Sequence, residues 1–223
     1  MVISNEFDDA AHDYLYLLEK SYPQKAIIKL IGDRYSLSGT ERTLLYRGLT
    51  TAAHRSARAK LLVDEAGIIG KSLYIDGYNV LITIGSYLNG SLVFIANDHF
   101  LRDASEIHGK VFRTELFDRG IQLIIDYLKH AGAGSACFYL DRPVSKSGIL
   151  AARVNQMLEE NSFPGEALTV RSPDYVLKQL ESGIVCTSDS TIIDKTQRKI
   201  FDLARNSLVH HFNPNFLDLG EIG

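Results

Sequence analysis

The sequence predicts an α/β fold, with a mostly parallel sheet that follows a small all-α N-terminal segment. Apolar residues up to about residue 67 recur at the three-and-four spacing of amphipathic helices. From residue 71 onward, short apolar runs alternate with helical patterns, which is typical of a parallel, doubly wound sheet. Four of these apolar runs end at an aspartate. We therefore expect a helical domain over residues 1–67 and an α/β domain over residues 71–223.

The helical segment is expected to contain three helices, which carry recognisable start signals. Pro23 suits the first position of a helix. Ser38 and Glu41 match a capping box, in which the hydroxyl and the carboxylate bond free backbone N–H groups at a helix start. Whether the third helix continues through Gly48 stays open. The expected helices span residues 7–21, 23–32 and 39–65.

The α/β domain is expected to alternate strands with helices after its first strand. Asn89-Gly90 is typical of a hairpin turn, so a pair of strands is expected around it. The expected strands span residues 72–76, 136–140, 167–170, 184–187 and 207–212. The expected helices span residues 114–131, 149–160, 173–181 and 193–206.

Composition and charge predict a soluble cytoplasmic protein with no membrane partner. The chain has 223 residues, 45% of them hydrophobic, and the apolar run from Val80 to Ile95 is interrupted before it could span a membrane. Cys137 and Cys186 lie far apart within apolar runs, which indicates buried reduced thiols. The net charge of −3 gives no general attraction to nucleic acid, so any such binding must use a local patch.

Four aspartates follow apolar runs, at Asp76, Asp98, Asp141 and Asp189. In an open α/β sheet, ligands bind outside the carboxyl ends of the strands, so these acids are expected to share a site. Carboxylate oxygens are the ligands that Mg²⁺ and Mn²⁺ prefer. Each acid alone is explained equally well by a local turn or a helix cap. Their joint occurrence favours a metal cluster, in which Asp76, Asp141 and Asp189 are also the catalytic candidates.

Residues near these acids are candidates for further ligands and for phosphate contacts. Asp103 competes with Asp98 for one place in the cluster, and Asp194 is a further possible ligand. Donors around the acids suit a phosphate near a helix N-terminus, although a solvated loop explains the same residues. The candidate phosphate contacts are Asn79, Arg102, Arg142, Lys146, Ser147 and Ser190.

Two motifs together resemble a known group of enzymes. Ile75-Asp-Gly-Tyr-Asn-Val80 ends the first strand, and Thr187-Ser-Asp-Ser190 follows a late one. This pair resembles the PIN-like and NYN-type nuclease domains, over about residues 71–212. With its helical segment in front, the whole chain resembles an uncharacterised, largely archaeal family whose carboxyl-terminal half has been described as PIN-like.

The resemblance implies a three-layer α/β/α domain in which three or four acids bind Mg²⁺ or Mn²⁺. It implies hydrolysis of phosphodiester bonds, in RNA rather than DNA, by an activated water. By motif, Asp76 would be the first metal ligand, Asp189 the late one and Asp194 a fourth. Which of Asp98, Asp103 and Glu115 completes the cluster stays open.

A noncatalytic module that holds RNA or a protein partner is the main alternative. Arg47, Arg55 and Arg58 would share one face with His54 if the third helix were continuous, and such a stripe could contact phosphates. A solvated charged face explains the same pattern. Affinity for divalent metal would discriminate the two functions. The oligomeric state, a homodimer included, stays open.

Other classes of site receive little support from the sequence. A phosphatase of the haloacid-dehalogenase type would need an aspartate where Tyr78 stands. The pair His210-His211 is expected in a late strand, where the two rings would point to opposite faces and play a structural part.

Overall fold

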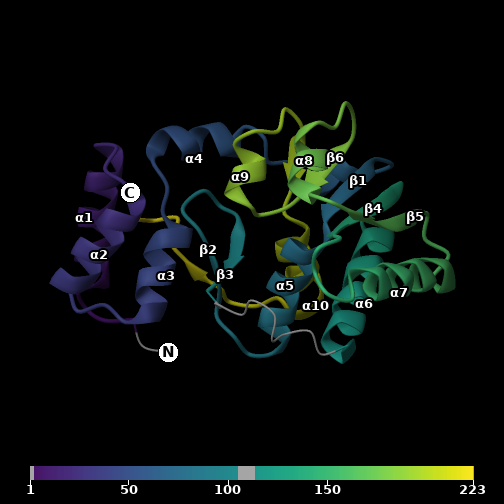
Figure 1. Cartoon of the computed structure of the whole chain (residues 1–223), viewed down its shortest axis with the longest axis horizontal. Helices are drawn as coiled ribbons and strands as arrows, with labels where there is room; N and C mark the ends of the chain where they lie inside the picture. Colours follow the sequence, from purple (N-terminus) through teal and green to yellow (C-terminus); the bar gives the residue numbers. More distant parts are fainter. Residues whose placement is uncertain (1–2, 105–113, 223) are drawn as a thin grey trace. The chain divides into compact units, whose positions relative to one another are not determined.

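A computed structural model describes residues 3–104 and 114–222 of the chain (Figure 1). The chain divides into two compact units. One, here called the helical unit, comprises residues 1–60, 91–106 and 215–223. The other, here called the sheet unit, comprises residues 61–90 and 107–214. Two later segments thus return to the helical unit, which differs from the single boundary expected at residues 67–70.

The sheet unit is built on a five-stranded sheet in the order β5-β4-β1-β6-β7, and every neighbouring pair is parallel. Its strands are β1 (Ser72–Asp76), β4 (Ser135–Asp141), β5 (Gly165–Val170), β6 (Ile184–Cys186) and β7 (Lys199–Phe201). Because the strands are parallel, their carboxyl ends lie at one edge of the sheet. The predicted parallel α/β fold is confirmed.

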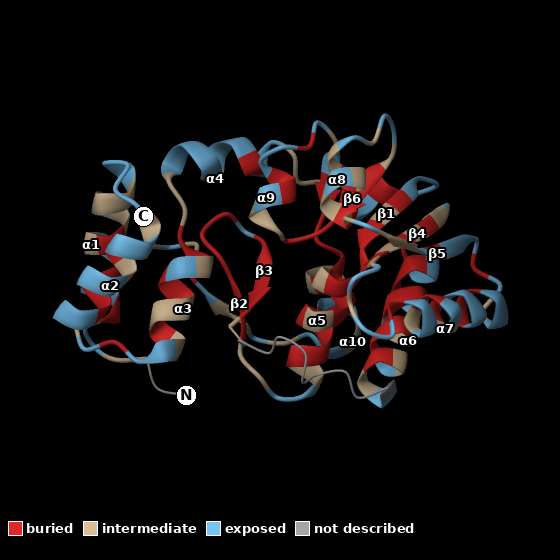
Figure 2. Ribbon diagram, viewed as in Figure 1, coloured by how far each residue is buried: buried red, intermediate tan, exposed pale blue. Residues whose placement is uncertain are grey.

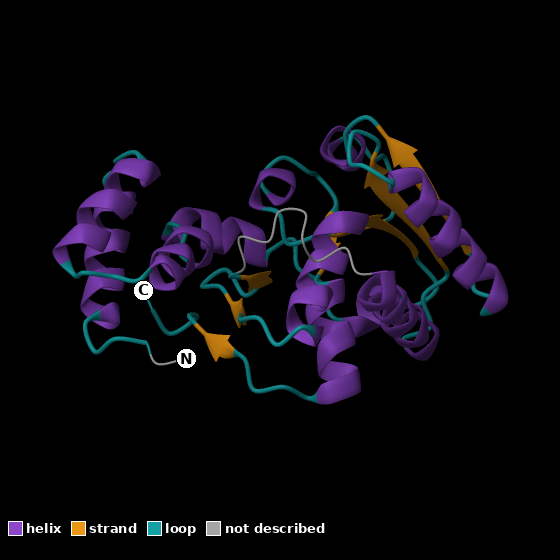
Figure 3. Ribbon diagram, turned by 60° about the horizontal axis from the view of Figure 1, so that its bottom comes forward, coloured by secondary structure: helices purple, strands orange, loops and turns teal. Residues whose placement is uncertain are grey.

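Helices cover both faces of this sheet and give three layers (Figure 3). One layer packs α5 and α7 on β1, β4 and β5, with α6 and α10 beside them; the other packs α8 on β1 and β4, with α9 against α8. The first layer comprises α5 (Gly77–Leu88), α6 (Thr114–His130), α7 (Ser147–Glu160) and α10 (Leu203–Phe212). The second comprises α8 (Pro173–Lys178) and α9 (Ser190–Ile193), and a short 3₁₀ turn, η1 (Glu65–Ile68), precedes β1.

The two faces of the sheet are buried to different extents (Figure 2). Alternate residues of a strand point to opposite faces, and β4 alternates strictly between buried and partly exposed residues. Leu73, Phe138 and Leu140 are fully buried. Tyr74 and Tyr139, which face the thin α8 and α9 layer, are only partly buried. This second face is therefore incompletely covered.

Both edges of the sheet have partners that satisfy outward backbone groups. On β5, the Asn155 side-chain oxygen accepts from Ala167 N at 2.7 Å, and its amide nitrogen donates to Ala167 O at 3.1 Å. On β7, Ile200 N donates to Leu61 O, and Val63 N donates to Ile200 O. These bonds limit the pairing of further strands at the two edges.

The helical unit combines four helices with a small three-stranded sheet. Its helices are α1 (Phe7–Glu19), α2 (Gln24–Arg34), α3 (Gly39–Gly48) and α4 (Ala52–Ala59). Its strands are β2 (Val93–Ile95), β3 (Leu101–Asp103) and β8 (Leu217–Asp218), in the order β3-β2-β8. Phe94 and Leu219 pack into one core with Phe7, Tyr14 and Leu44. This shared core explains why residues from the later segments belong with the helices.

The predicted capping box at α3 is confirmed. Ser38 Oγ accepts from Glu41 N at 3.3 Å, and Glu41 accepts from Ser38 N at 2.9 Å. Glu41 also accepts from Ser4 N at 2.8 Å. Burial would raise the pKa of Glu41, but the hydrogen bonds from Ser4 and Ser38 outweigh it and lower the pKa to about 2.

Three secondary-structure predictions are wrong. No hairpin surrounds Asn89-Gly90, because residues 77–88 form α5 directly after β1. The strand expected over residues 207–212 belongs to α10, whose buried residues 203, 204, 207 and 208 follow helical spacing. The helix expected over residues 193–206 is divided, since residues 199–201 pair with β6 as β7. Pairing within the sheet overrides local propensity there.

The bonds at the β5 edge lead to a stability prediction. Replacing Asn155 by leucine should lower the free energy of unfolding by about 1–3 kcal/mol, because two backbone groups of Ala167 lose their partners. Urea denaturation would measure the change. The control is Gln156→Leu on the same helix, where only the exposed Glu160 is a partner and the change should stay within about 0.5 kcal/mol. Equal effects of both substitutions would contradict the role given to Asn155.

Candidate acidic site

The first candidate, Asp76, ends β1 and stands directly before α5, with only 6% of its surface exposed. Its carboxylate makes no capping hydrogen bond to α5. It accepts instead from Thr187 Oγ1, just past β6, at 2.9 Å. The next residue is Gly77, and a larger residue would not fit there, because a Cβ would lie 2.6 Å from Leu140 and 3.0 Å from the carbonyl oxygen of Tyr139. Glycine thus lets α5 begin tightly against β4.

Asn79 joins the end of β1 to the loop after β6. Its side-chain oxygen accepts from Ser188 N at 2.9 Å and from Ser188 Oγ at 3.1 Å. Thr187 Oγ1 also lies 3.4 Å from that oxygen. The predicted role of Asn79 as a phosphate contact is not what these bonds show, since its oxygen is used to hold residues 187–188. It positions the loop that carries Asp189.

Asp189 caps the short helix α9, as one of its two interpretations from the sequence anticipated. Its Oδ1 accepts from Thr191 N at 2.6 Å, and its own N–H donates to Thr187 Oγ1 at 3.1 Å. The side chain is half-buried. Capping uses one carboxylate oxygen, Oδ1, in these contacts, so Oδ2 is not used by this cap.

Four carboxylates interact electrostatically at the carboxyl ends of the strands. The pKa of Asp76 is raised to about 7, and burial is the largest cause. The hydrogen bond from Thr187 opposes this rise, and the charges of Asp189, Asp174 and Asp141 add to it. The pKa of Asp141 is also raised, by burial and then by Asp174. The expectation that Asp76, Asp141 and Asp189 lie near one another is therefore supported by the effect of Asp141 and Asp189 on the pKa of Asp76.

Asp174 is the member that the sequence reasoning missed. It lies in the first turn of α8, shortly after β5 ends at Val170. Ser172 begins that helix, since its hydroxyl accepts from Tyr175 N at 3.3 Å. The signal was present in Ser172-Pro-Asp174, because this acid also follows the carboxyl end of a strand. It was overlooked because the apolar run does not itself end at the aspartate.

The arrangement suits a hard cation that keeps most of its water ligands. Among the residues that the structure describes, no three histidine, cysteine, aspartate or glutamate side chains are grouped closely enough to enclose a metal ion. Lys178 Nζ lies 3.5 Å from Asp174. Mg²⁺ is commonly held by one or two carboxylates together with waters and substrate phosphates, and this acidic group fits that mode. Asp76 and Asp189 are the residues that would hold it.

The loop after β4 keeps two of its predicted phosphate contacts accessible. Arg142 and Lys146 are exposed, and Arg142 Nη2 donates to the carbonyl oxygen of Thr169 at 3.1 Å. Ser147 is buried and donates to the carbonyl oxygen of Arg142 at 3.3 Å, which makes it part of the loop structure. Lys146 stands directly before α7 with a positive φ of 65°.

The remaining sheet-unit candidates lie further along their elements. Ser190 is the first residue of α9, and Asp194 stands at the opposite end of that helix, exposed. Glu115 is exposed in the first turn of α6. Asp194 and Glu115 are not among the carboxylates that raise the pKa of Asp76. The structure thus gives them less support than Asp174.

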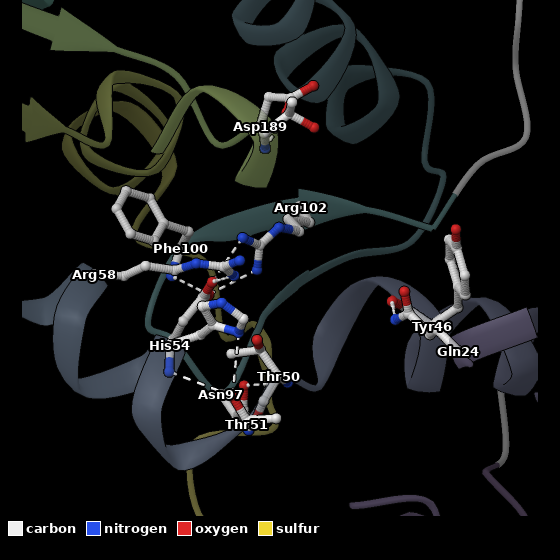
Figure 4. A network of polar contacts seen from close by, with 12 residues as sticks. Gln24, Tyr46, Thr50, Thr51, His54, Arg58, Asn97, Phe100, Arg102 and Asp189 are labelled. Carbon is white, nitrogen blue, oxygen red and sulfur yellow. Dashed lines mark hydrogen bonds and ion pairs between the residues drawn. The ribbon is translucent and has the colours of Figure 1, made fainter. Parts of the chain in front are cut away.

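Asp98 forms a buried ion cluster within the helical unit, which corrects its assignment as a metal ligand. Both oxygens of Asp98 accept from Arg102, at 2.6 and 2.7 Å, and Arg58 Nη1 donates to the same carboxylate at 2.7 Å (Figure 4). Burial would raise the pKa of Asp98, but Arg102 and Arg58 outweigh it and lower the pKa. Two guanidinium groups therefore neutralise this acid, and Arg102 is used structurally.

The predicted arginine stripe is also wrong. The helix breaks between α3 and α4, where Thr50 N donates to the Asn97 side-chain oxygen and Asn97 Nδ2 donates to Thr50 O, both at 3.0 Å (Figure 4). Arg58 is 6% exposed, and Arg47 pairs with Asp103 at 3.2 Å. Asp103, a candidate metal ligand from the sequence, is thus held in an ion pair with Arg47. Arg47 and Arg55 are partly exposed, whereas Arg58 is buried, so the three do not form one exposed face.

The histidine pair departs from its expected strand geometry as well. His210 and His211 lie in the last turn of α10. Their ring centroids are 4.8 Å apart, and His130 lies 4.3 Å from His210. His211 Nε2 bonds to the carbonyl oxygen of Leu123 at 3.0 Å.

Comparison with known proteins places the chain among families of unknown function. The model described as "Domain of unknown function (DUF5616)" matches residues 65–206, and "Protein of unknown function (DUF434)" matches residues 6–60. The chain is also 32% identical over 202 residues to an uncharacterised protein of Methanocaldococcus jannaschii, covering 90% of this chain and 96% of that relative. No solved structure matches it. Within residues 3–104 and 114–222, no helix is long and apolar enough to cross a membrane.

The chain belongs to the DUF5616 family. The two matched ranges meet close to the start of the sheet unit at Leu61. The four interacting carboxylates all lie within the range matched by the DUF5616 model.

The ion cluster around Asp98 leads to a second stability prediction. Asp98→Asn should lower the free energy of unfolding by about 3–5 kcal/mol at neutral pH, since it leaves buried guanidinium charge uncompensated. Because the folded pKa of Asp98 is lowered, this contribution is present above the unfolded pKa and is lost as pH falls through the folded value. Chemical denaturation across pH measures it. Asp33→Asn, at the exposed pair with Arg42, is the control and should cost about 1 kcal/mol or less.

The raised pKa of Asp76 leads to a prediction of the opposite sign. Its folded pKa of about 7 exceeds the unfolded value, so stability is greatest below the unfolded pKa and falls as pH rises through about 7. Asp76→Asn should therefore raise the melting temperature at pH 8 without metal, and the gain should vanish near pH 4. Thermal unfolding checks this. Asp126→Asn, at an exposed aspartate, should show no such pH-dependent gain, and a loss of stability at pH 8 in Asp76→Asn would refute the argument.

Proposed function

We propose that this protein is a divalent-metal-dependent nuclease that hydrolyses phosphodiester bonds in RNA, in the cytoplasm, with Mg²⁺ or Mn²⁺ as cofactor. One observation carries the proposal. Asp76 is 6% exposed, yet its neighbours at the strand ends are three other acids, whose charges raise its pKa. Buried carboxylates without a compensating cation are costly, and perturbed groups of this kind are typical of functional sites.

The roles of the residues follow from their contacts. Asp76 and Asp189 would hold the metal, with Asp141 and Asp174 adding negative charge at the same edge. Thr187 Oγ1 donates a 2.9 Å hydrogen bond to Asp76 Oδ2. This bond restricts rotation of the Asp76 carboxylate and so fixes its orientation. The chemistry supplied by a bound Mg²⁺ or Mn²⁺ is activation of water and neutralisation of charge on the phosphate.

Cations for the phosphate come from the loop after β4. Arg142 and Lys146 are exposed in the loop that follows Asp141. A phosphate bound near the acids would therefore find two cationic side chains in that loop. The Asp76-Gly-Tyr-Asn79 motif resembles that of PIN-like nucleases, which supports the same reaction. In this chain Asn79 contributes indirectly, by holding the loop before Asp189.

A noncatalytic RNA-binding or protein-interaction module is the second candidate. It is favoured by the fact that the described residues contain no group of three metal-ligating side chains ready to enclose an ion. In that case the acidic edge would be a recognition surface, and the four carboxylates would not require divalent metal.

Cleavage assays separate these two functions. Purified protein with Mn²⁺ should cleave single-stranded RNA, and Asp76→Asn or Asp189→Asn should each reduce the rate by about 100-fold or more, since metal-site substitutions have effects of at least 10–100-fold. Asp118→Asn is the matched control, because this aspartate of α6 pairs with Arg153 and is not among the acids that raise the pKa of Asp76, so the variant should retain wild-type activity.

Activity that persists in both site variants would assign the cleavage to a contaminant and refute the proposal. Calorimetric titration of Mn²⁺ into wild type and Asp76→Asn adds an independent readout. Absence of Mn²⁺ binding to the wild type, together with retained RNA binding, would establish the noncatalytic module.

A further inference from the structure

An open groove of about 570 Å³ lies on the incompletely covered face of the sheet, over β1, β4 and β5. A volume of this size is within the range of small-ligand sites. None of the candidate residues discussed above forms its floor. The side chains used in the argument below are Ser72, Tyr74, Ser135, Cys137, Tyr139 and Glu166.

Sheet register connects this groove to the acidic site through its tyrosines, since its other lining residues lie toward the amino ends of β1, β4 and β5. Tyr139 of β4 is the direct partner of Asp76 in β1, and Tyr74 precedes Asp76 by two residues on the same face. Neighbouring strands lie about 4.8 Å apart, so Tyr139 is adjacent to the buried carboxylate. From Asp76 back to Ser72 the strand extends about 13 Å at about 3.3 Å per residue, so the groove reaches from the amino end of β1 to the tyrosines next to the acids.

Two tyrosines form a fixed aromatic wall of the groove. The rings of Tyr74 and Tyr139 are nearly parallel, at 8°, with centroids 6.3 Å apart. Both pack against the small core that contains Leu177 of α8. Gly183 leaves room for the Tyr74 ring, since a Cβ there would lie 2.4 Å from Tyr74 Cε2. The rings are therefore positioned before any ligand arrives, which reduces the entropy cost of binding.

The floor and rim of the groove are polar. Ser135 Oγ donates to Ser72 Oγ at 3.0 Å. Glu166, which is the register partner of Cys137, is exposed at the rim. A carboxylate accepts hydrogen bonds from the exocyclic amino groups of nucleobases, and every base has a face that stacks on an aromatic ring. Aromatic walls with a polar rim are thus matched to a base.

We propose that this groove binds an unpaired nucleobase of an RNA strand whose phosphate lies at the acidic site. The inference rests on the proposed function and specifies its substrate as single-stranded RNA. A base within a duplex is stacked and paired, so it does not reach a groove in the side of a sheet. A second copy of the chain is a poorer occupant, because a stable dimer buries about 800 Å² per partner around an apolar centre, whereas this floor is polar.

The chain carries its own probe for this groove. It has two cysteines, and Cys137 lines the groove and is half-buried, whereas Cys186 is fully buried. The rate of Cys137 alkylation is therefore measured in the folded Asp76→Asn protein, in which cleavage is expected to be slow, with Mn²⁺ present so that the phosphate charge near the remaining acids is neutralised. A short single-stranded RNA should slow alkylation several-fold at saturation. The same sequence in a blunt duplex should not.

A matched pair of variants tests the aromatic wall. Tyr139→Phe keeps the ring and should keep the protection, measured as the ratio of rates with and without RNA. Tyr139→Leu should lose it. Because Tyr139 also packs on the core containing Leu177, thermal unfolding must show that the leucine variant is folded at the assay temperature. Mass mapping of alkylated Cys186, which is fully buried, reports any global opening.

The possible outcomes distinguish the two proposals. Alkylation that single-stranded RNA leaves unchanged overturns the base site, even if Mn²⁺-dependent cleavage is observed. Equal protection by the duplex also overturns it. Protection that grows with protein concentration alone would assign the groove to a second copy. Protection by single-stranded RNA without any cleavage by the wild type would support the base site and refute the nuclease.

Discussion

The hydrogen bond from Thr187 to Asp76 is the interaction on which the acidic site depends. It joins the ends of β1 and β6, which are neighbours in the sheet but separated by more than a hundred residues in the chain. Because all five strands run parallel, the loops that follow them emerge at one edge, and this single geometric fact gathers Asp141, Asp174 and Asp189 around the same carboxylate. Asn79 reinforces the junction by accepting two hydrogen bonds from Ser188.

Two buried aspartates show how surroundings decide between structural and chemical roles. Asp98 is fully buried, but Arg58 and Arg102 bond to it and lower its pKa. Asp76 is almost as buried, but other acids surround it and its pKa rises to about 7. The first carboxylate is stabilised as an anion and has no oxygen free of guanidinium groups. The second remains short of positive charge, which is the condition under which a carboxylate gains most from a divalent cation.

The alternation of strands and helices in a parallel sheet was readable from the sequence, and so were three of the four interacting acids. Asp76, Asp141 and Asp189 each follow an apolar run, whereas Asp174 enters through the first turn of a helix. Asp98 looked equivalent because one of its two arginine partners, Arg58, lies forty residues earlier, and the other, Arg102, was interpreted as a phosphate contact. The sequence of α5 is rich in β-branched and aromatic residues, which favours a strand. In the structure this segment is a helix buried between the sheet and the neighbouring helices. Long-range pairing decided each of these errors.

Incomplete cover on one face of the sheet connects stability to recognition. Helices α8 and α9 span six and four residues, too few to cover β5, and Leu168 stays 39% exposed. The opposite face buries Phe138 and Leu140 completely under longer helices, so the fold has sufficient core without closing the second face. In β4 the residues of that open face lead from Cys137 through Tyr139 to Asp141. One strand thus presents an aromatic ring and a carboxylate in succession. Such a strand can contact, along its length, a ligand that has both a planar group and a phosphate.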